Sequence, residues 1–236
     1  LIRFYSVPHV RNYIKRQLQL ELLGEVPVLS IRTEPLQNPV NRLAKRLFDL
    51  TFSSLFLLTI FPFIYLIVGL IIKITSPGPI FFKQERNGEN GKIFKCYKFR
   101  SMKVNALSDS LQATKNDPRK TKFGNFLRKS NLDELPQFIN VFKGEMSIVG
   151  PRPHMLKHTE EYSQLINKYM MRHLVKPGIT GWAQVTGYRG ETKELSQMEG
   201  RVRRDLWYIE NWTFLLDIRI MIKTVTNMFR GEKNAY

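Results

Sequence analysis

The feature that most constrains this chain is an uncharged run from Leu50 to Ile72, LTFSSLFLLTIFPFIYLIVGLII. At a rise of about 1.5 Å per residue, some twenty apolar residues in a helix can cross the hydrocarbon core of a bilayer. A small soluble domain seldom buries a run this apolar, so the pattern favours a membrane segment over a core helix. Pro62 lies near the middle of the run. Because proline lacks a backbone donor and clashes with the preceding turn, we expect the helix to break there.

Basic residues flank the apolar run on both sides. They are Arg42, Lys45 and Arg46 before it and Lys73, Lys83, Arg86, Lys92 and Lys95 after it. Positive flanks tend to stay on the cytoplasmic side of a membrane, and a simple span would place one of these flanks outside. A helix that enters the membrane, bends at Pro62 and returns to the same face keeps both flanks inside. We therefore favour this re-entrant hairpin, and a simple span stays open as the alternative.

The overall charge indicates an anionic partner. The 236 residues include 37 Lys and Arg against 20 Asp and Glu, for a formal net charge of +17. Nucleic acid, an acidic membrane leaflet or phosphorylated substrates would each suit that excess, and a solvated basic surface is the alternative. The single cysteine, Cys96, excludes an internal disulfide and fits a reducing compartment.

Other stretches give local predictions. Residues 1–40 look like the tail of a further N-terminal domain, with a short buried strand at Val26–Ile31 followed by a proline-containing linker. Ile80–Lys83 and Ile93–Phe99 flank NGENG and predict a β-hairpin. Asn105–Lys122 is polar and predicts a mobile loop. Near the C-terminus, apolar residues at three- and four-residue steps predict one face of a helix. This face would lie at the membrane interface or pack on the core, and we favour the interface. Its residues are Tyr208, Trp212, Leu215, Ile218, Ile222, Val225 and Phe229.

Two adjacent acids, Asp133 and Glu134, stand between Arg128 and Arg152. Pro136 belongs in the first turn of a helix, so the helix should begin near Asp133. Two interpretations stay open. In the first, the acids serve as an N-cap and a complement to the helix dipole. Alternatively, a helix N-terminus keeps a carboxylate ionised so that it attacks a phosphorus, while the arginines and a metal neutralise the phosphate charge. Mg²⁺ commonly takes one or two carboxylates together with phosphates and water.

Other chemistries find little support in the sequence. There is no phosphate-binding Walker loop and no nucleophile elbow. His154, His158 and His173 do not form a zinc-binding spacing with cysteines or acids. GPRP at Gly150–Pro153 gives a stiff turn that directs Arg152, whereas Lys176–Gly190 predicts a structured loop without an assigned role.

Taken in order, the motifs resemble those of a known family. They are KRLFDL, the apolar run with its central proline, SPGPIFFKQERNG, YKFRSM, DELPQ, GEMSIVGPRP, KPGITGWAQVTGYRG and RRDLWYIENW. Over about Asn41 to Tyr236 the chain resembles the monotopic phosphoglycosyl transferases, bacterial sugar transferases that initiate glycan assembly on a polyprenol carrier. Within that family it is most similar to the undecaprenyl-phosphate glucose phosphotransferases of exopolysaccharide synthesis.

The resemblance implies an α+β, mostly helical fold. Residues 41–75 would form the re-entrant membrane hairpin broken at Pro62, and residues 76–236 a compact catalytic domain with a small β-hairpin and amphipathic interfacial helices. The place implied is the cytoplasmic face of the bacterial inner membrane. The partners implied are a UDP-sugar, UDP-glucose being favoured, undecaprenyl phosphate and membrane lipids, with no nucleic acid; self-association stays open.

The resemblance also implies roles for single residues. Asp133 would be the nucleophile that attacks the β-phosphorus of the UDP-sugar and releases UMP, and it would hold the phosphosugar until the polyprenyl phosphate attacks. Glu134 would assist the metal or orient the acceptor, and Mg²⁺ would bind at Asp133. The predicted substrate-binding residues are Arg128, Arg152, Arg86, Arg100, Arg204 and Asp205. A basic membrane-anchored binding protein and a non-catalytic scaffold are the alternatives to an enzyme.

Overall fold

The fold is mostly helical, with short paired strands. The computed structural model describes residues 19–23, 26–30, 34–103, 117, 119–190 and 194–230. In this part of the chain the elements are β1 (Gln19–Leu23), β2 (Val26–Ser30), η1 (Pro35–Gln37), α1 (Pro39–Thr59), α2 (Phe61–Thr75), β3 (Phe81–Asn87), η2 (Glu89–Gly91), β4 (Ile93–Phe99), α3 (Lys122–Lys129), η3 (Leu132–Glu134), α4 (Gln137–Lys143), β5 (Ser147–Val149), α5 (Leu156–Leu165), η4 (Tyr169–Leu174), β6 (Gly178–Thr180), α6 (Trp182–Val185), α7 (Leu195–Glu210) and α8 (Phe214–Arg230). The predicted α+β, mostly helical class is confirmed.

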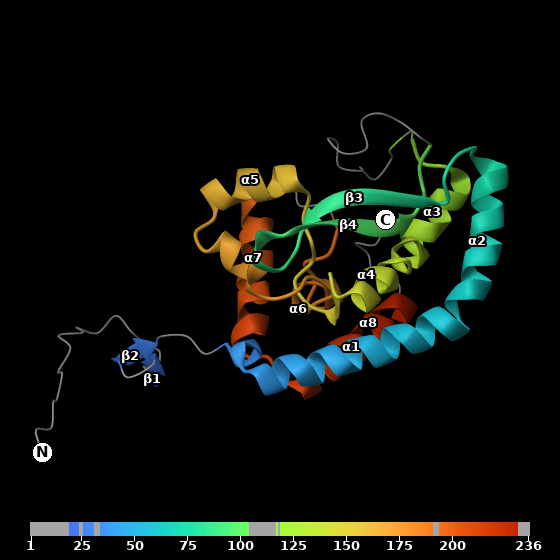
Figure 1. The fold of residues 1–236 in the computed structure, drawn as a ribbon. Helices are drawn as coiled ribbons and strands as arrows, with labels where there is room; N and C mark the ends of the chain where they lie inside the picture. The colour runs from blue at the N-terminus through green and yellow to red at the C-terminus, as the bar shows by residue number, and fades with distance from the viewer. Residues whose placement is uncertain are drawn as a thin grey trace, which may run out of the picture.

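Helices α1 and α2 form a bent pair along the lower and right margins of the view in Figure 1. The two helices meet at Ile60 with a bend of 56°. Pro62 lies in the first turn of α2, where its missing N–H leaves no intrahelical bond unmade. The predicted break is therefore confirmed. Within the described residues no single helix is long and apolar enough to cross a bilayer, whereas this bent pair meets that test by length and composition.

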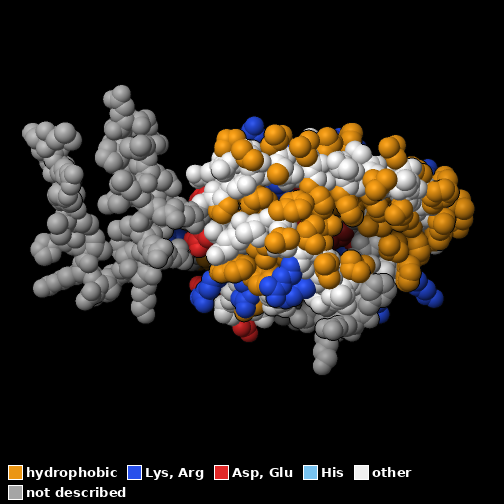
Figure 2. Space-filling view, turned by 90° about the horizontal axis from the view of Figure 1, so that it is seen from below, with side chains coloured by type: hydrophobic (Ala, Val, Ile, Leu, Met, Phe, Trp, Pro, Cys, Tyr) orange, Lys and Arg blue, Asp and Glu red, His pale blue; other side chains and the backbone are white. Residues whose placement is uncertain are grey.

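A broad apolar surface covers the side formed by α1, α2 and α8, and Figure 2 shows it with Lys and Arg side chains gathered along one margin. Its exposed apolar side chains on the bent pair include Leu43, Leu47, Leu55, Leu58, Ile60, Phe63, Leu66, Ile67, Leu70 and Ile74. Helix α8 adds Leu215, Ile222, Val225 and Met228. Soluble proteins seldom leave so many large apolar side chains together in water, so we name this the apolar face and return to it below.

The hairpin β3–β4 lies across the middle of the molecule (Figure 1). Its strands pair antiparallel from Phe81 opposite Phe99 onward, which confirms the predicted hairpin and lengthens its first strand. Asn140 of α4 completes the free edge of β4: its Nδ2 donates to the Lys95 carbonyl at 2.8 Å, and its Oδ1 accepts from the Tyr97 amide at 3.0 Å. Because Asn140 is fully buried, this amide fixes α4 against the hairpin.

Three glycines bring two further strands into very close contact. Strands β5 and β6 pair in parallel, and a Cβ built on Gly178 would lie 2.0 Å from the Gly150 nitrogen. A Cβ on Gly181 would lie 2.2 Å from the Gly150 oxygen, and one on Gly150 itself 2.5 Å from the Lys176 oxygen. No side chain fits at these positions, so the glycines hold the GPRP turn against the segment that begins at Lys176.

Helix α1 is fastened to α4 and β5 by two polar side chains. Arg46 donates from both terminal nitrogens to the carbonyls of Val141 and Phe142, at 2.7 and 2.8 Å, and so satisfies the C-terminal end of α4. Asp49 accepts from the Ile148 amide at 3.0 Å. The bent pair is thus tied directly to the elements around the acidic pair.

A buried ion cluster joins α1 to the C-terminal helices. Asp217 accepts hydrogen bonds from Lys45 Nζ at 2.5 Å, Tyr208 Oη at 2.7 Å and Trp212 Nε1 at 3.0 Å. Each of these four side chains is buried. We call this set of residues the α1 anchor.

The single C-terminal helix predicted from periodicity is wrong in one respect, whereas the exposure of its α8 part is compatible with the favoured interface. The structure has two helices, α7 and α8, separated by residues 211–213. On α8, Leu215 and Ile222 are 78% and 59% exposed, so this part of the predicted face does not pack on the core. The face of α8 that does so carries Asp217 and Ile220 instead.

Some predictions fall wholly or partly outside the described residues. The strand at Val26–Ile31 is present as β2, but the burial of its side chains lies outside the description, as does the side chain of Phe229. Most of the predicted loop, residues 104–116 and 118, also lies outside it. The domain boundaries at residues 40 and 75 stay predictions.

Candidate active site

The acidic pair lies in the 3₁₀ turn η3 and not at the start of an α-helix. Asn131 precedes the turn with a φ of 58°, a left-handed conformation that asparagine tolerates. Helix α4 begins only at Gln137, directly after Pro136. The prediction of a helix that begins near Asp133 is therefore wrong by about one turn. Neither start has a side-chain cap hydrogen bond in the described residues, so the capping interpretation gains no support.

Glu134 is held by two cations. Arg152 donates from its two terminal nitrogens to the two carboxylate oxygens, at 3.1 and 2.5 Å. Lys98 Nζ on β4 donates to Oε1 at 2.7 Å. Burial by itself would raise the pKa of Glu134, but Arg152 and Lys98 outweigh it and hold the pKa well below the ordinary value. Glu134 is therefore ionised and both of its oxygens are occupied.

Asp133 is equally buried but stands in a different environment. No described residue gives its carboxylate a hydrogen bond or an ion pair. Burial raises the pKa of Asp133 to about 6; Lys98 and Arg128 lower it, and the neighbouring charge of Glu134 raises it. This contradicts the expectation that a helix N-terminus keeps the pKa low. The result is an open carboxylate that is more basic than usual and still largely ionised at neutral pH.

Arg128 lies on α3, which packs against η3. Its Nε donates to Ser101 Oγ at 2.8 Å, and its charge interacts with both Asp133 and Glu134. Burial lowers the pKa of Arg128, and the two carboxylates oppose that shift. The structure therefore brings Arg128 and Arg152 to the acidic pair from different elements, and the cations around it suit a diphosphate ligand.

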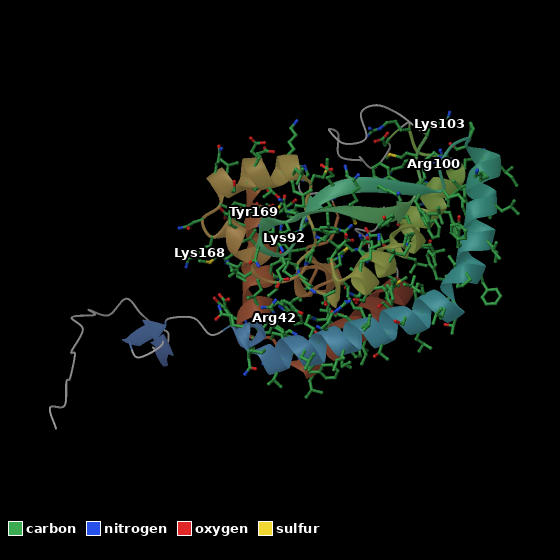
Figure 3. All side chains as sticks on the ribbon, in the orientation of Figure 1. Arg42, Lys92, Arg100, Lys103, Lys168 and Tyr169 are labelled. Carbon is green, nitrogen blue, oxygen red and sulfur yellow. The ribbon has the colours of Figure 1, made fainter. Side chains whose placement is uncertain are left out.

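Two further predicted arginines contact backbone carbonyls. Arg86 of β3 donates to Gln84 Oε1 at 2.5 Å and to the Pro153 carbonyl at 3.5 Å, so it lies against the GPRP turn. Arg100, labelled in Figure 3, is buried where β4 ends and donates to the carbonyls of Ser76 and Pro77 just after α2. These contacts position the chain around the site. Direct contact of either arginine with a phosphate stays a prediction.

Arg204 and Asp205 lie on α7, and their described contacts are with other residues than the acidic pair. The Arg204 guanidinium stacks on the ring of Tyr188 with its carbon 3.8 Å from the ring centre. Asp205 is buried and accepts from Arg172 at 2.6 and 3.1 Å. Within the described residues neither side chain contacts Asp133 or Glu134, and their predicted binding of substrate stays a prediction.

The segment Lys176–Gly190 is more regular than predicted, because it contains β6 and α6. Its end borders the acidic turn: Arg189 donates to the side-chain oxygen of Asn131. Arg201 of α7 donates to the carbonyls of Tyr188 and Gly190, at 3.1 and 2.9 Å. The segment therefore supplies one wall next to η3.

The family described as bacterial sugar transferase matches residues 40–231. The chain belongs to this family. It is 52% identical over 98% of its length to the UDP-glucose:undecaprenyl-phosphate glucose-1-phosphate transferase of Escherichia coli (strain K12), and 49% and 47% identical over 98% to the proteins of that name in Klebsiella pneumoniae and Xanthomonas campestris pv. campestris. These matches cover 49%, 49% and 48% of the relatives, so the chain spans about half of their length.

Reasoning from sequence gave no role to Lys98, although it lies within the motif YKFRSM. A signal was present, because Phe94, Cys96 and Lys98 alternate along β4 and the first two are buried. A lysine that continues a buried strand face needs an acidic partner, which is Glu134. Arg172 was missed as well, and nothing in its local sequence marks it.

The residues of the site fit a magnesium ion bound together with a phosphorylated substrate. The described residues contain no group of three or more His, Cys, Asp and Glu side chains able to hold a metal by themselves. Asp133, however, has an open carboxylate, and Mg²⁺ often takes one carboxylate with its remaining positions filled by phosphates and water. Glu134 is less suited to this role, because cations occupy both of its oxygens.

Proposed function

We propose that this chain carries the catalytic part of an enzyme that transfers glucose 1-phosphate from UDP-glucose to undecaprenyl phosphate and releases UMP. The observation that carries the proposal is the buried carboxylate of Asp133, which receives no hydrogen bond from the described residues although the charges of Lys98, Arg128 and Arg152 act on it. The names of the three relatives, each similar to this chain over nearly its whole length, support the choice of substrates.

In the first step a carboxylate oxygen of Asp133 attacks the phosphorus that carries the sugar. The bond from that phosphorus to the bridging oxygen breaks, and UMP leaves with the electron pair. Arg128 and Arg152 neutralise charge on the phosphate oxygens as the bond breaks. A pKa of about 6 suits this role, because the carboxylate is ionised at neutral pH and more basic than an exposed aspartate.

In the second step a phosphate oxygen of undecaprenyl phosphate attacks the same phosphorus. The bond between Asp133 and phosphorus breaks, the carboxylate is regenerated, and the product is undecaprenyl diphosphate glucose. Glu134 contributes by holding Arg152 and Lys98 in place beside Asp133. When bound, Mg²⁺ would be held by Asp133 and the substrate phosphates and would supply further neutralisation of phosphate charge.

The apolar face supports a position on a membrane. In this proposal α1 and α2 enter the cytoplasmic leaflet of the bacterial inner membrane and return to the same side, while α8 lies along the surface. Labels placed near Lys45 and near Lys92 test this topology. Both are expected to react with a reagent added to the cytoplasmic side of inverted membrane vesicles, and labelling from opposite sides would overturn the re-entrant arrangement.

The nucleophile is tested by the substitution Asp133→Asn. With the chain in lipid nanodiscs, UDP-glucose and undecaprenyl phosphate, release of UMP should fall by about 10³-fold or more, since nucleophile loss has effects of this order. Mass spectrometry of the wild-type chain quenched during turnover should show a hexose phosphate adduct on the peptide with Asp133. Release of UMP by Asp133→Asn at the wild-type rate would refute the assignment.

The sugar is tested by a screen of UMP release. UDP-glucose, UDP-galactose and the two N-acetylated UDP-hexosamines are each supplied with undecaprenyl phosphate. The highest kcat/KM is expected for UDP-glucose. A higher value for another sugar would change the substrate while keeping the reaction, and turnover of none would favour a binding protein or scaffold.

A further inference from the structure

Arg172 and Asp205 form an ion pair that is almost wholly removed from solvent. Arg172 is on η4 and Asp205 on α7, and their side chains are each 2% exposed. Two nitrogens of the guanidinium contact the same carboxylate oxygen, at 2.6 and 3.1 Å. A buried pair of this kind seldom adds stability over an apolar pair of similar size, so its other contacts indicate what it is for.

One of the remaining hydrogen bonds of Arg172 stays within η4, where Nη1 donates to Tyr169 Oη at 3.4 Å, and the others lead to Arg152 and His154 around the GPRP turn. Its Nη2 also donates to the backbone carbonyl of Arg152 at 2.9 Å. Its Nη1 donates to Nδ1 of His154 at 2.6 Å. Tyr169 Oη also lies 2.6 Å from Nδ1 of His154. One guanidinium therefore fixes the chain on both sides of Pro153.

From Arg152 the contacts continue into the acidic pair. The backbone of Arg152 is held by Arg172, and its side chain makes the two-point contact with Glu134. Two-point contacts between arginine and a carboxylate depend on the direction of the guanidinium plane. A change in the backbone at Arg152 would therefore move its guanidinium relative to Glu134 and to a phosphate at Asp133.

We propose that Arg172, held by Asp205, is a positioning residue for phosphosugar transfer that acts through Arg152. It makes no contact with the acidic pair in the described structure. Its role is to fix the backbone from which Arg152 reaches Glu134 and the substrate phosphate. The proposal rests on the function proposed above, and it gives Asp205 a role different from direct substrate binding.

A double-mutant cycle on kcat/KM for UMP release tests the proposal. Arg172→Lys keeps a positive charge to pair with Asp205. It replaces the three donor nitrogens of the guanidinium with one, so the chain cannot be held at Asp205, Arg152 and His154 together. In the otherwise unchanged chain we expect kcat/KM to fall by about 10- to 100-fold, as for loss of a charged hydrogen bond. In the Arg152→Lys background, which lacks the two-point contact, the further fall should be less than about 2-fold. Equal factors in both backgrounds would overturn the proposal.

The matched control is Lys45→Arg in the α1 anchor, which is also a charge-conserving change in a buried ion pair. Its effect should be the same factor in both backgrounds, because Lys45 has no contact with the GPRP turn in the described residues. The split between kcat and KM gives a second readout. Arg172→Lys should lower kcat more than it raises KM, because Arg152 neutralises charge that grows on the phosphate as the bond breaks, whereas Lys45→Arg should leave the kcat-to-KM balance of the wild type in place.

Two outcomes separate this inference from the proposed function. If the wild-type chain releases no UMP from any UDP-sugar with undecaprenyl phosphate, both the function and the inference fail. If the wild type is active and the fold losses in kcat/KM of Arg172→Lys and Arg152→Lys multiply in the double variant, the inference alone fails. Should Arg172→Lys not yield folded protein, Asp205→Glu takes its place in the cycle, with the same loss expected in the first background and the same near-absence of loss in the second.

Discussion

The α1 anchor and the acidic turn each bury an aspartate, and they treat it in opposite ways. In the anchor, Asp217 accepts from Lys45, Tyr208 and Trp212. In the acidic turn, Glu134 takes the direct contacts, and no described residue donates to Asp133. A buried charge with all its partners holds a fold together, whereas one without them destabilises the fold and stays open to a ligand. The difference supports the proposal that Asp133 is the group that carries out the chemistry.

The largest effect on stability is expected in the anchor. Asp217→Asn leaves the ammonium of Lys45 buried without a carboxylate in contact, while the charge of Asp49 still acts on it, and this should lower the free energy of unfolding by about 3–5 kcal/mol. Denaturant unfolding of the chain in detergent at pH 8 measures the change. A loss below about 1 kcal/mol would show that the anchor does not depend on its charge.

The same substitution at Asp133 should stabilise the fold, whereas Asp217→Asn destabilises it. Burial raises the pKa of Asp133 from 3.8 to about 6, so above that range the folded chain must hold an unfavourable ionised group. Asp133→Asn removes the cost of burying this charge and should raise the free energy of unfolding by up to about 3 kcal/mol. The gain should be complete above about pH 6 and shrink as the pH falls toward 3.8. A destabilised Asp133→Asn chain at pH 8 would contradict the comparison.

Activity should follow the same ionisation. Below about pH 6, kcat/KM is expected to fall by about tenfold per pH unit as Asp133 becomes protonated. The charge of Glu134 raises the pKa of Asp133, so in Glu134→Gln the limb should move to lower pH, although the overall rate falls. The pH profile of UMP release measures both effects, and a limb that stays in place in Glu134→Gln would remove Glu134 from the environment of Asp133.

The smallest effect is expected where α1 joins α4. Arg46→Gln removes the two-point contact with the carbonyls of Val141 and Phe142, and unfolding should become easier by about 1 kcal/mol. The acid limb should not move, since Arg46 contacts neither carboxylate in the described structure. A shifted limb would mean that the charge of Arg46 acts on the pKa of Asp133.

Sequence reasoning succeeded where the signal was local. Pro62 marked the helix break and the glycine-rich turn marked the hairpin, because each acts on its own few residues. It failed at the start of α4, since Pro136 was assigned to the first turn when it precedes that turn. The sequence alone also did not show why glycine stands at positions 150, 178 and 181. The reason is the close backbone contact between strands that lie apart in the sequence.

The environment of the site was harder to predict, because it is built by distant contacts. Lys98 lies 36 positions from Glu134, and Arg172 lies 33 positions from Asp205. No period or motif predicts which distant residue neutralises a buried carboxylate. For the same reason the raised pKa of Asp133 could not be foreseen, since it depends on how completely the folded chain removes the group from water.

The contact of Arg46 with the last carbonyls of α4 has a geometric consequence. Phe138, in the first turn of α4, contacts Phe52 and Phe56 of α1, so α4 lies alongside α1 and is held at both of its ends. The acidic pair ends two residues before α4 begins. If α1 enters the lipid as proposed, the depth of α1 in the bilayer also sets the level of the carboxylates, and the lipid-borne phosphate meets them next to the membrane helix.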